Sequence, residues 1–261
     1  MTLVLTELSL LGIAMAADSA VTTPSLTPNR QRIFPRVLIG VTKLFPIHKL
    51  QAGVCAWGLG QISAIDTDVW LKNFIVSNED RYSALQDFVL LLQNELRKHV
   101  PDIDLNQYPY GTVGFHVTGF VEWKGRKLPD FYHVHNGRSQ VLESRGQASQ
   151  IDPRRVNANH DMPPEECEKL FSQGMAYITR NGDYQMYAAL SSLVEQFFDM
   201  LGKRGFQIPY PPSLKARAEY LRFWIKTMSE IYRLSNIVPG IGGPVTSLII
   251  SERGIEGYET L

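Results

Sequence analysis

Two short apolar runs at the start of the chain constrain its fold most strongly. They occupy residues 2–8 and 13–22, and a short segment containing Gly12 separates them. Two β-rich runs joined through a glycine-containing turn predict a β-hairpin. No Lys or Arg precedes these runs and Glu7 interrupts them, so we interpret them as strands and not as a signal peptide. A strand that starts at Thr2 would place this residue at the mouth of a sheet, where the strand begins, with no disordered tail ahead of it.

Length and composition narrow the class of protein. A chain of 261 residues, 44% of them hydrophobic, can bury one large core or two small ones. The 26 basic and 26 acidic side chains cancel, which gives no support for binding to nucleic acid or to an anionic membrane surface. No apolar stretch is long enough to span a membrane. Two cysteines in a chain of this length fit a reducing compartment, and we expect a cytoplasmic protein.

Beyond residue 62 the hydrophobic period alternates between that of helices and that of strands. The predicted helices cover residues 67–80, 83–100 and 214–234. The predicted hairpin covers residues 112–122 and 130–135, and a strand, turn and helix follow over residues 175–198. We expect Val69, Leu71, Phe74 and Ile75 to form the buried stripe of the first helix, and Ser83 to cap the second. This order predicts one α+β domain over residues 1–261, with two sheets between helical layers.

A set of polar residues and glycines recurs at fixed positions around the N-terminal strands. Thr2 opens the first strand, Asp18 ends the second, and Val21 and Thr22 follow. Lys43 then opens the segment KLFPI, and Gly58 ends the segment AWG. In this pattern the chain resembles β-type proteasome subunits or their bacterial relatives, such as HslV and Anbu, which are threonine N-terminal-nucleophile (Ntn) hydrolases. The resemblance implies a four-layer α-β-β-α sandwich and is strongest before residue 62.

The resemblance also implies a catalytic role for each of these residues. A threonine hydroxyl is a weak nucleophile that needs a base, and a free α-amine titrates close enough to neutrality to serve. Thr2 would therefore be both nucleophile and base after removal of Met1, Lys43 an electrostatic activator and Asp18 its counter-ion. The backbone N–H of Gly58 would donate to the oxyanion. We expect replacement of Lys43 to abolish hydrolysis with little loss of stability.

Small residues occupy the positions where such relatives line their substrate pocket. The expected substrate-binding residues are Ala20, Val21, Thr22, Ala56 and Gly60. They suggest room for a sizeable apolar side chain, which Trp57 would narrow. The expected substrate is a peptide or an unfolded protein, reached inside homo-oligomeric rings, with an ATP-dependent unfoldase as a partner and no cofactor.

Departures from the family pattern leave alternatives open. Asn181 stands where the family has a serine that supports the nucleophile, although an amide can still donate and accept hydrogen bonds. An altered support shell favours a catalytically inert structural subunit of a ring. Long segments at residues 23–40 and 138–172, the second a probable insertion, would instead suit an Ntn amidase that acts on a small molecule.

Three histidines raise the question of a metal. His133 and His135 share one face of a predicted strand, and His116 lies on the strand before it. No further ligand has a diagnostic spacing, and alternating histidines are more often ordinary strand residues. We therefore expect no metal site.

Overall fold

The N-terminal hairpin lies at the centre of a five-stranded antiparallel sheet. The structure is a computed structural model that describes residues 2–23, 36–100, 112–136, 155–182, 184–206, 211–235 and 240–261. The sheet has the strand order β12-β1-β2-β13-β14. Its strands are β1 (Leu3–Ser9), β2 (Gly12–Ala17), β12 (Tyr177–Gly182), β13 (Thr246–Ser251) and β14 (Gly254–Thr260). Ser9 pairs with Gly12 across the predicted turn, so the hairpin prediction is confirmed.

A second five-stranded antiparallel sheet carries the segments that follow Lys43, in the order β11-β10-β9-β6-β5. Its strands are β5 (Leu44–Ile47), β6 (Ala52–Gly58), β9 (Val113–Trp123), β10 (Arg126–His135) and β11 (Asn157–Met162). Two small ribbons pair β3 (Val21–Thr23) with β4 (Arg36–Leu38), and β7 (Gln61–Ile62) with β8 (Ile65–Asp66).

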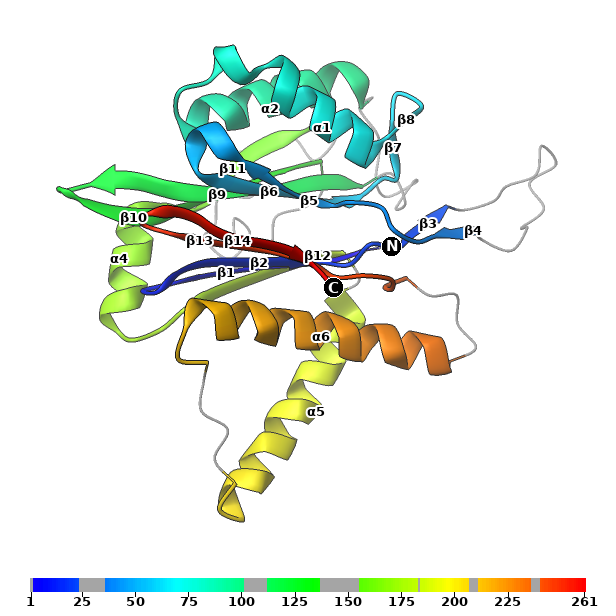
Figure 1. Ribbon diagram of the computed structural model, residues 1–261, viewed down its shortest axis with the longest axis vertical. Helices are drawn as coiled ribbons and strands as arrows, with labels where there is room; N and C mark the ends of the chain where they lie inside the picture. Colours follow the sequence, from blue (N-terminus) through cyan, green and yellow to red (C-terminus); the bar gives the residue numbers. More distant parts are fainter. Residues whose placement is uncertain are drawn as a thin grey trace.

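The two sheets stack face to face, and helices cover their outer faces (Figure 1). Helices α1 (Thr67–Ser77) and α2 (Leu85–His99) lie over the second sheet, α6 (Leu214–Leu234) lies under the first, and α4 (Pro164–Ser172) lies beside both sheets. Helix α5 (Tyr184–Lys203) extends away from the sheets. Single 3-10 turns lie at His48–Leu50 and Glu79–Arg81. The predicted α+β class is therefore confirmed at this level.

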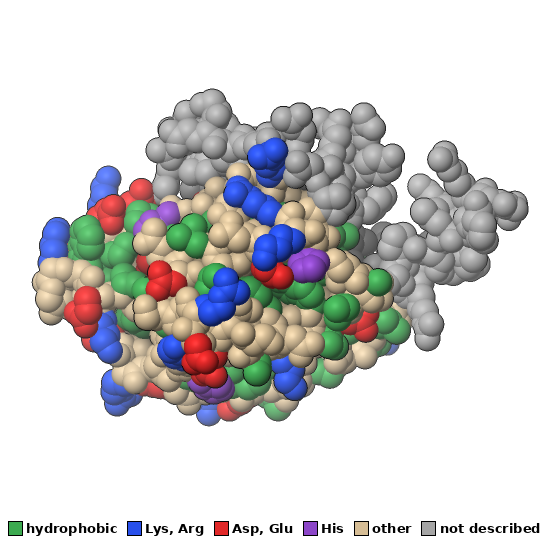
Figure 2. Space-filling model, turned by 90° about the horizontal axis from the view of Figure 1, so that it is seen from above, with side chains coloured by type: hydrophobic (Ala, Val, Ile, Leu, Met, Phe, Trp, Pro, Cys, Tyr) green, Lys and Arg blue, Asp and Glu red, His purple; other side chains and the backbone are tan. Residues whose placement is uncertain are grey.

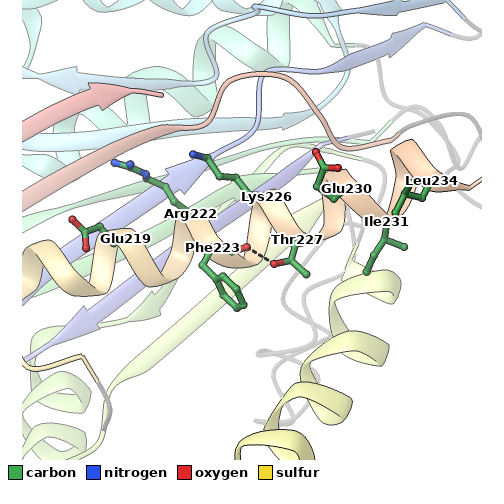
Figure 3. A pocket seen from close by; sticks show the side chains of 8 residues that line it. All are labelled: Glu219, Arg222, Phe223, Lys226, Thr227, Glu230, Ile231 and Leu234. Carbon is green, nitrogen blue, oxygen red and sulfur yellow. Dashed lines mark hydrogen bonds between the residues drawn. The ribbon is translucent and has the colours of Figure 1, made fainter. Parts of the chain in front are cut away.

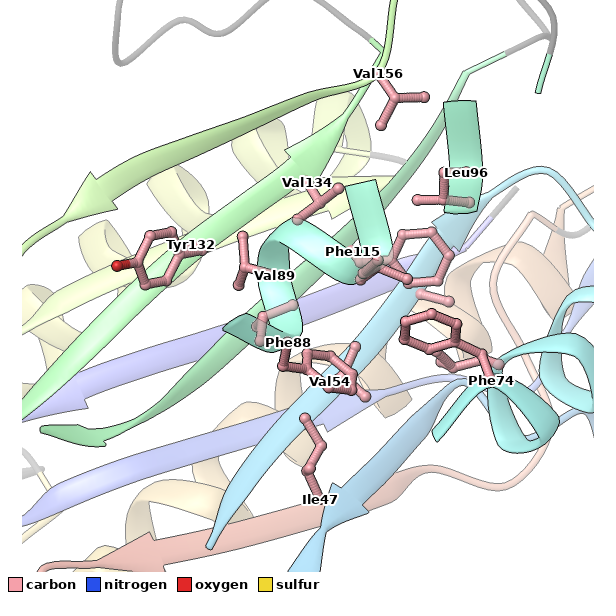
Figure 4. Packing of buried hydrophobic residues seen from close by; sticks show 14 of the residues in the cluster. Ile47, Val54, Phe74, Phe88, Val89, Leu96, Phe115, Tyr132, Val134 and Val156 are labelled. Atoms are coloured by element: carbon pink, nitrogen blue, oxygen red, sulfur yellow. The ribbon is translucent and has the colours of Figure 1, made fainter. Parts of the chain in front are cut away.

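Three hydrophobic clusters hold these elements together. One packs α1 and α2 on the second sheet around Phe74, Phe88 and Phe115 (Figure 4). Another packs α6 on the first sheet around Trp224. The third fills the space between the two sheets, where Met15 is fully buried. Because this third cluster takes side chains from both sheets, it joins the halves into one core.

The helices lie where the sequence predicted them, but the buried residues of α1 and the cap of α2 differ from the predictions. Helix α6 has the predicted bounds, and Trp70 is buried in α1 while Val69 is 46% exposed, so the predicted stripe of α1 was wrong at Val69. Ser83 does not cap α2; the cap residue is Ala84, and Asp87 accepts from the backbone N–H of Ser83 and Ala84. The acidic side chain inside the first turn therefore replaces the predicted hydroxyl cap.

The two segments singled out as long loops are only partly described. Residues 24–35 and 137–154 lie outside the described residues. Within the predicted insertion at 138–172, residues 157–172 contain β11 and α4, and β11 pairs with β10.

The charged side chains are mixed over the face in Figure 2, where Lys and Arg lie among Asp and Glu without a large area of one sign. This agrees with the zero formal net charge. Within the described ranges, none of the helices is both long and apolar enough to cross a membrane.

Candidate active site

The site is built around the carboxylate of Asp18, directly after β2. Its side chain is buried and accepts a hydrogen bond from Lys43 Nζ at 2.8 Å. The backbone N–H of Leu3 donates to the same oxygen, Oδ1, at 3.0 Å. Two more backbone N–H groups, those of Ala20 and Gly242, donate to Oδ2, each at 3.1 Å. Four donors thus fix a buried anion at the open end of the N-terminal hairpin.

Lys43 faces this carboxylate from the other sheet. It precedes β5 and is 5% exposed, and its Nζ also donates to the Ala20 carbonyl. Burial lowers the pKa of the Lys43 ammonium from its ordinary value, and the Asp18 carboxylate opposes that shift. The pair therefore places a desolvated cation between the two sheets, held in position at both of these acceptors.

Thr2 stands at the start of β1, beside the last residue of β12. It is 3% exposed. Gly182 packs so closely on it that a Cβ at this glycine would lie 1.7 Å from the Thr2 carbonyl oxygen, and Gly182 has φ +100°. Only a glycine fits this contact, so Gly182 fixes the Thr2 backbone.

A narrow cavity brings the predicted nucleophile, cation and oxyanion donor together. Its volume is about 20 Å³, little more than one water molecule needs. The lining residues are Thr2, Val21, Val41, Thr42, Lys43, Ala56, Trp57, Gly58, Leu59, Gly60, Thr67 and Asp68. Seven of the ten predicted site residues therefore lie at this cavity or, in the case of Asp18, hold a side chain that lines it.

Three predicted residues are placed differently. Ala20 is buried and does not line the cavity; its N–H binds Asp18 and its carbonyl binds Lys43. The side chain of Thr22 lies outside the described part of the structure. Asn181 pairs with Val4 in the sheet, and its Oδ1 lies 2.6 Å from His116 Nε2. In the structure, the Asn181 side chain therefore contacts a histidine of the second sheet.

Gly58 is required by the fold itself. It ends β6 with φ +93°, and a Cβ there would lie 2.0 Å from the carbonyl oxygen of Thr112. The strand pairing alone therefore accounts for a glycine at this position.

The three predicted histidines do come together, but they do so inside the protein. The rings of His133 and His135 stack with centroids 4.0 Å apart, and the ring of His116 lies 5.2 Å from that of His133. Burial lowers the pKa of His116 to about 4. Among the described residues, no group of three or more His, Cys, Asp or Glu side chains could hold a metal ion.

A larger and more open hollow lies elsewhere, on the outer surface of α6 (Figure 3). Its side chains come from residues 219–234, and the Thr227 hydroxyl donates to the Phe223 carbonyl within the helix. Arg222 is paired with Glu259. None of its lining residues belongs to the cavity at Thr2.

The comparisons with known proteins gave structural similarities alone. No protein-family model and no curated protein sequence matches the chain. An Anbu mutant from Hyphomicrobium sp. strain MC1 is similar in structure with a TM-score of 0.46 and 12% identity, over 100% of this chain and 87% of that one. The Anbu complex from Pseudomonas aeruginosa, solved as a helical assembly, is similar with a TM-score of 0.43 and 11% identity, over 100% and 86%.

These similarities correct the family suggested by the sequence. Anbu proteins form a distinct proteasome-related family, which the sequence resemblance named only among several bacterial relatives. The assignment to β-type proteasome subunits or to HslV-like proteins was therefore wrong. The resemblance had rested on short motifs around Thr2, Asp18 and Lys43, and such motifs do not separate related families.

Proposed function

We propose that this chain is a threonine-type N-terminal-nucleophile hydrolase that cleaves peptide bonds, with Thr2 as the nucleophile after removal of Met1. The observation that supports this most is the shared cavity of Thr2, Lys43 and Gly58, with Asp18 bound to the Lys43 ammonium. We also propose that the stacked sheets and their helices form the four-layer α-β-β-α sandwich of this class, as one domain over residues 1–261.

The proposed reaction has two halves. The Thr2 hydroxyl attacks the scissile carbonyl carbon while the free α-amine of Thr2 takes the hydroxyl proton. The carbonyl oxygen becomes an oxyanion that accepts a hydrogen bond from the Gly58 N–H. The C–N bond then breaks, the leaving amine receives the proton from the α-ammonium, and an ester on Thr2 remains. Water then attacks the ester carbonyl carbon while the α-amine takes a proton from it. The bond between this carbon and the Thr2 oxygen breaks, the peptide acid leaves, and Thr2 regains its free hydroxyl and amine.

Lys43 and Asp18 prepare the nucleophile in this scheme. A cation beside the α-amine disfavours its protonated form and so keeps it available as a base near neutral pH. The same cation stabilises the developing alkoxide. Because the pair is buried, its field is little weakened by solvent, and Asp18 keeps the lysine from withdrawing toward water.

A peptide epoxyketone tests the nucleophile and the base together. It forms bonds with both a hydroxyl and a free α-amine on one residue, so we expect an adduct that maps to Thr2 and an intact mass that lacks Met1. The Thr2→Ala variant should form no adduct. A retained Met1 together with an absence of adduct would instead favour the inert subunit, and an adduct without hydrolysis of any peptide would favour the small-molecule amidase.

We further propose that copies of the chain assemble into a homo-oligomer, with a ring as the expected form. Support comes from α5, which extends away from the sheets and exposes Leu193, Phe197 and Met200 by 62%, 49% and 46%. Exposed apolar side chains on one projecting helix are costly in a monomer. Sedimentation velocity should show species well above 29.5 kDa, and a monomer at all concentrations would contradict this proposal.

A further inference from the structure

Trp57 occupies an unusual position next to the candidate site. It lies in β6 directly before Gly58 and lines the cavity at Thr2. Its register partner in β9 is Gly114, and a Cβ at Gly114 would lie 2.3 Å from two carbons of the indole ring. The indole therefore folds flat over a glycine of the neighbouring strand, where no larger residue fits.

His133 holds the far end of this indole. Trp57 Nε1 donates a hydrogen bond to His133 Nε2 at 3.2 Å, and the ring centroids lie 5.6 Å apart. Since an indole nitrogen can only donate, Nε2 of His133 must be an acceptor, and the imidazole is neutral with its proton on Nδ1. Burial lowers the pKa of His133 well below its usual value, and the neighbouring His116 adds to that shift.

The Asp161 carboxylate favours the same tautomer of His133, from the Nδ1 side of the imidazole ring. Its Oδ2 lies 3.5 Å from His133 Nδ1, and both side chains are buried. A carboxylate there favours a proton on Nδ1, which leaves Nε2 free to accept from Trp57. The stacked ring of His135 limits rotation of His133. The orientation of Trp57 thus depends on a chain of polar contacts that begins on β11 and ends at the cavity.

We propose that His133 is a positioning residue for the Thr2 pocket: with Asp161, it fixes the Trp57 indole as a wall that admits only a small side chain beside the scissile bond. The substrate class is then a peptide with Gly, Ala or Ser at that position. This inference rests on the proposed function. It also revises the sequence-based expectation of a sizeable apolar side chain, because that expectation counted the small residues Val21, Ala56 and Gly60 and could not orient the indole.

A double-mutant cycle separates this role from ordinary core packing. The measured quantity is the ratio of kcat/KM for two peptides that differ only in Leu or Ala before the scissile bond. We expect both Trp57→Phe and His133→Leu to raise the Leu/Ala ratio by about tenfold, the low end of what a single methylene is worth in a hydrophobic pocket. In the Trp57→Phe background, His133→Leu should add less than twofold, because its effect passes through the indole N–H.

Two further variants control this cycle. His133→Gln keeps a side-chain acceptor and should retain most of the wild-type ratio. His160→Gln changes a histidine that is 39% exposed and hydrogen-bonded to Asp130, and it should leave the ratio unchanged. Independent, additive effects of Trp57→Phe and His133→Leu, or a wild-type enzyme that prefers Leu, would overturn the inference.

A spectroscopic measurement keeps the inference testable if the protein hydrolyses nothing. The Raman difference between wild type and Trp57→Phe isolates the indole N–H band of Trp57. We expect a hydrogen-bonded N–H that becomes free in His133→Leu and stays bonded in His133→Gln. Absence of both hydrolysis and an epoxyketone adduct refutes the proposed function and the substrate class with it; an N–H band that does not respond to His133→Leu refutes the positioning role by itself.

Discussion

The Asp18 carboxylate has both a structural and an electrostatic role. It closes the backbone around the N-terminal hairpin through the N–H groups of Leu3, Ala20 and Gly242, and it neutralises the Lys43 ammonium. A lost partner therefore affects both the fold and the site. The pair is almost fully buried, so each charge depends on the other to offset the cost of leaving water.

Replacing Lys43 should accordingly cost stability as well as activity. Lys43→Met keeps most of the side-chain volume but leaves Asp18 as a buried anion with only its backbone donors. We expect a loss of about 3 kcal/mol in the free energy of unfolding, at the low end for a broken buried pair because three N–H donors remain. Urea unfolding measures it. The sequence alone led us to expect little loss, and an unchanged midpoint would restore that view. Lys49→Met, at an exposed lysine, is the control.

Acid should destabilise the protein through His116. Its pKa is about 4 in the fold against 6.5 ordinarily, so between these values the unfolded chain binds the proton and the folded chain does not. Stability therefore rises with pH from about 4 to 6.5, by roughly 3 kcal/mol for this group. His116→Gln should flatten that part of the pH–stability curve, measured by urea unfolding at several pH values.

At the scale of elements, the two C-terminal helices differ in what they contribute. Helix α6 buries a stripe that includes Leu221, Trp224 and Ile225 against the first sheet. Helix α5 contacts the same cluster through Tyr187, Leu190 and Val194, and it exposes Leu193. The amphipathic period alone does not distinguish these cases, because both helices have an apolar side.

Alanine substitutions should reveal the difference directly. Trp224→Ala removes a large side chain that is 2% exposed and should cost about 3–5 kcal/mol of unfolding free energy. Leu193→Ala should change it by less than about 0.5 kcal/mol. Both values come from chemical unfolding at a protein concentration low enough to suppress association. Similar costs for the two variants would mean that the Leu193 side of α5 also packs against the body of the protein.

The sequence predicted elements with strong periodicity and missed those with weak patterns. Helix α6 and the N-terminal hairpin were correct because their apolar residues recur at clear spacings. Strand β11, NANHDM, was missed, since its polar residues face other buried polar groups: His135 Nε2 lies 2.7 Å from the amide nitrogen of Asn159. A period-2 search recognises apolar alternation and does not detect such a strand.

In the candidate site, too, some residues could be predicted from the sequence and others could not. Thr2, Asp18, Lys43 and Gly58 could be selected from the family resemblance, and in the structure Thr2, Lys43 and Gly58 line one cavity while Asp18 binds Lys43. Trp57, His133 and Gly182 could not be assigned their positions, because these follow from the pairing of strands far apart in sequence. The one available signal for Trp57 was its place beside Gly58, which gave its neighbourhood but not its orientation.

For the molecule as a whole, the cluster between the sheets should make unfolding a single event. This cluster joins Val4 and Met15 of the first sheet to Cys55 and Phe131 of the second. Neither sheet can separate without exposing this surface, so the two halves should not melt independently. Calorimetry should give one transition with equal calorimetric and van't Hoff enthalpies per folding unit. Met15→Ala should reduce the free energy of unfolding by about 2–5 kcal/mol and move the single transition to a lower temperature. A split into two transitions would show that the sheets are separate domains.

The hydrogen bond from the Gly242 N–H to Asp18 spans 224 residues, almost the full length of the chain. The carboxylate therefore has its full set of four donors only when the segment around Gly242 has docked beside β2. Undocking this segment would leave Oδ2 of the buried carboxylate with a single donor, the Ala20 N–H.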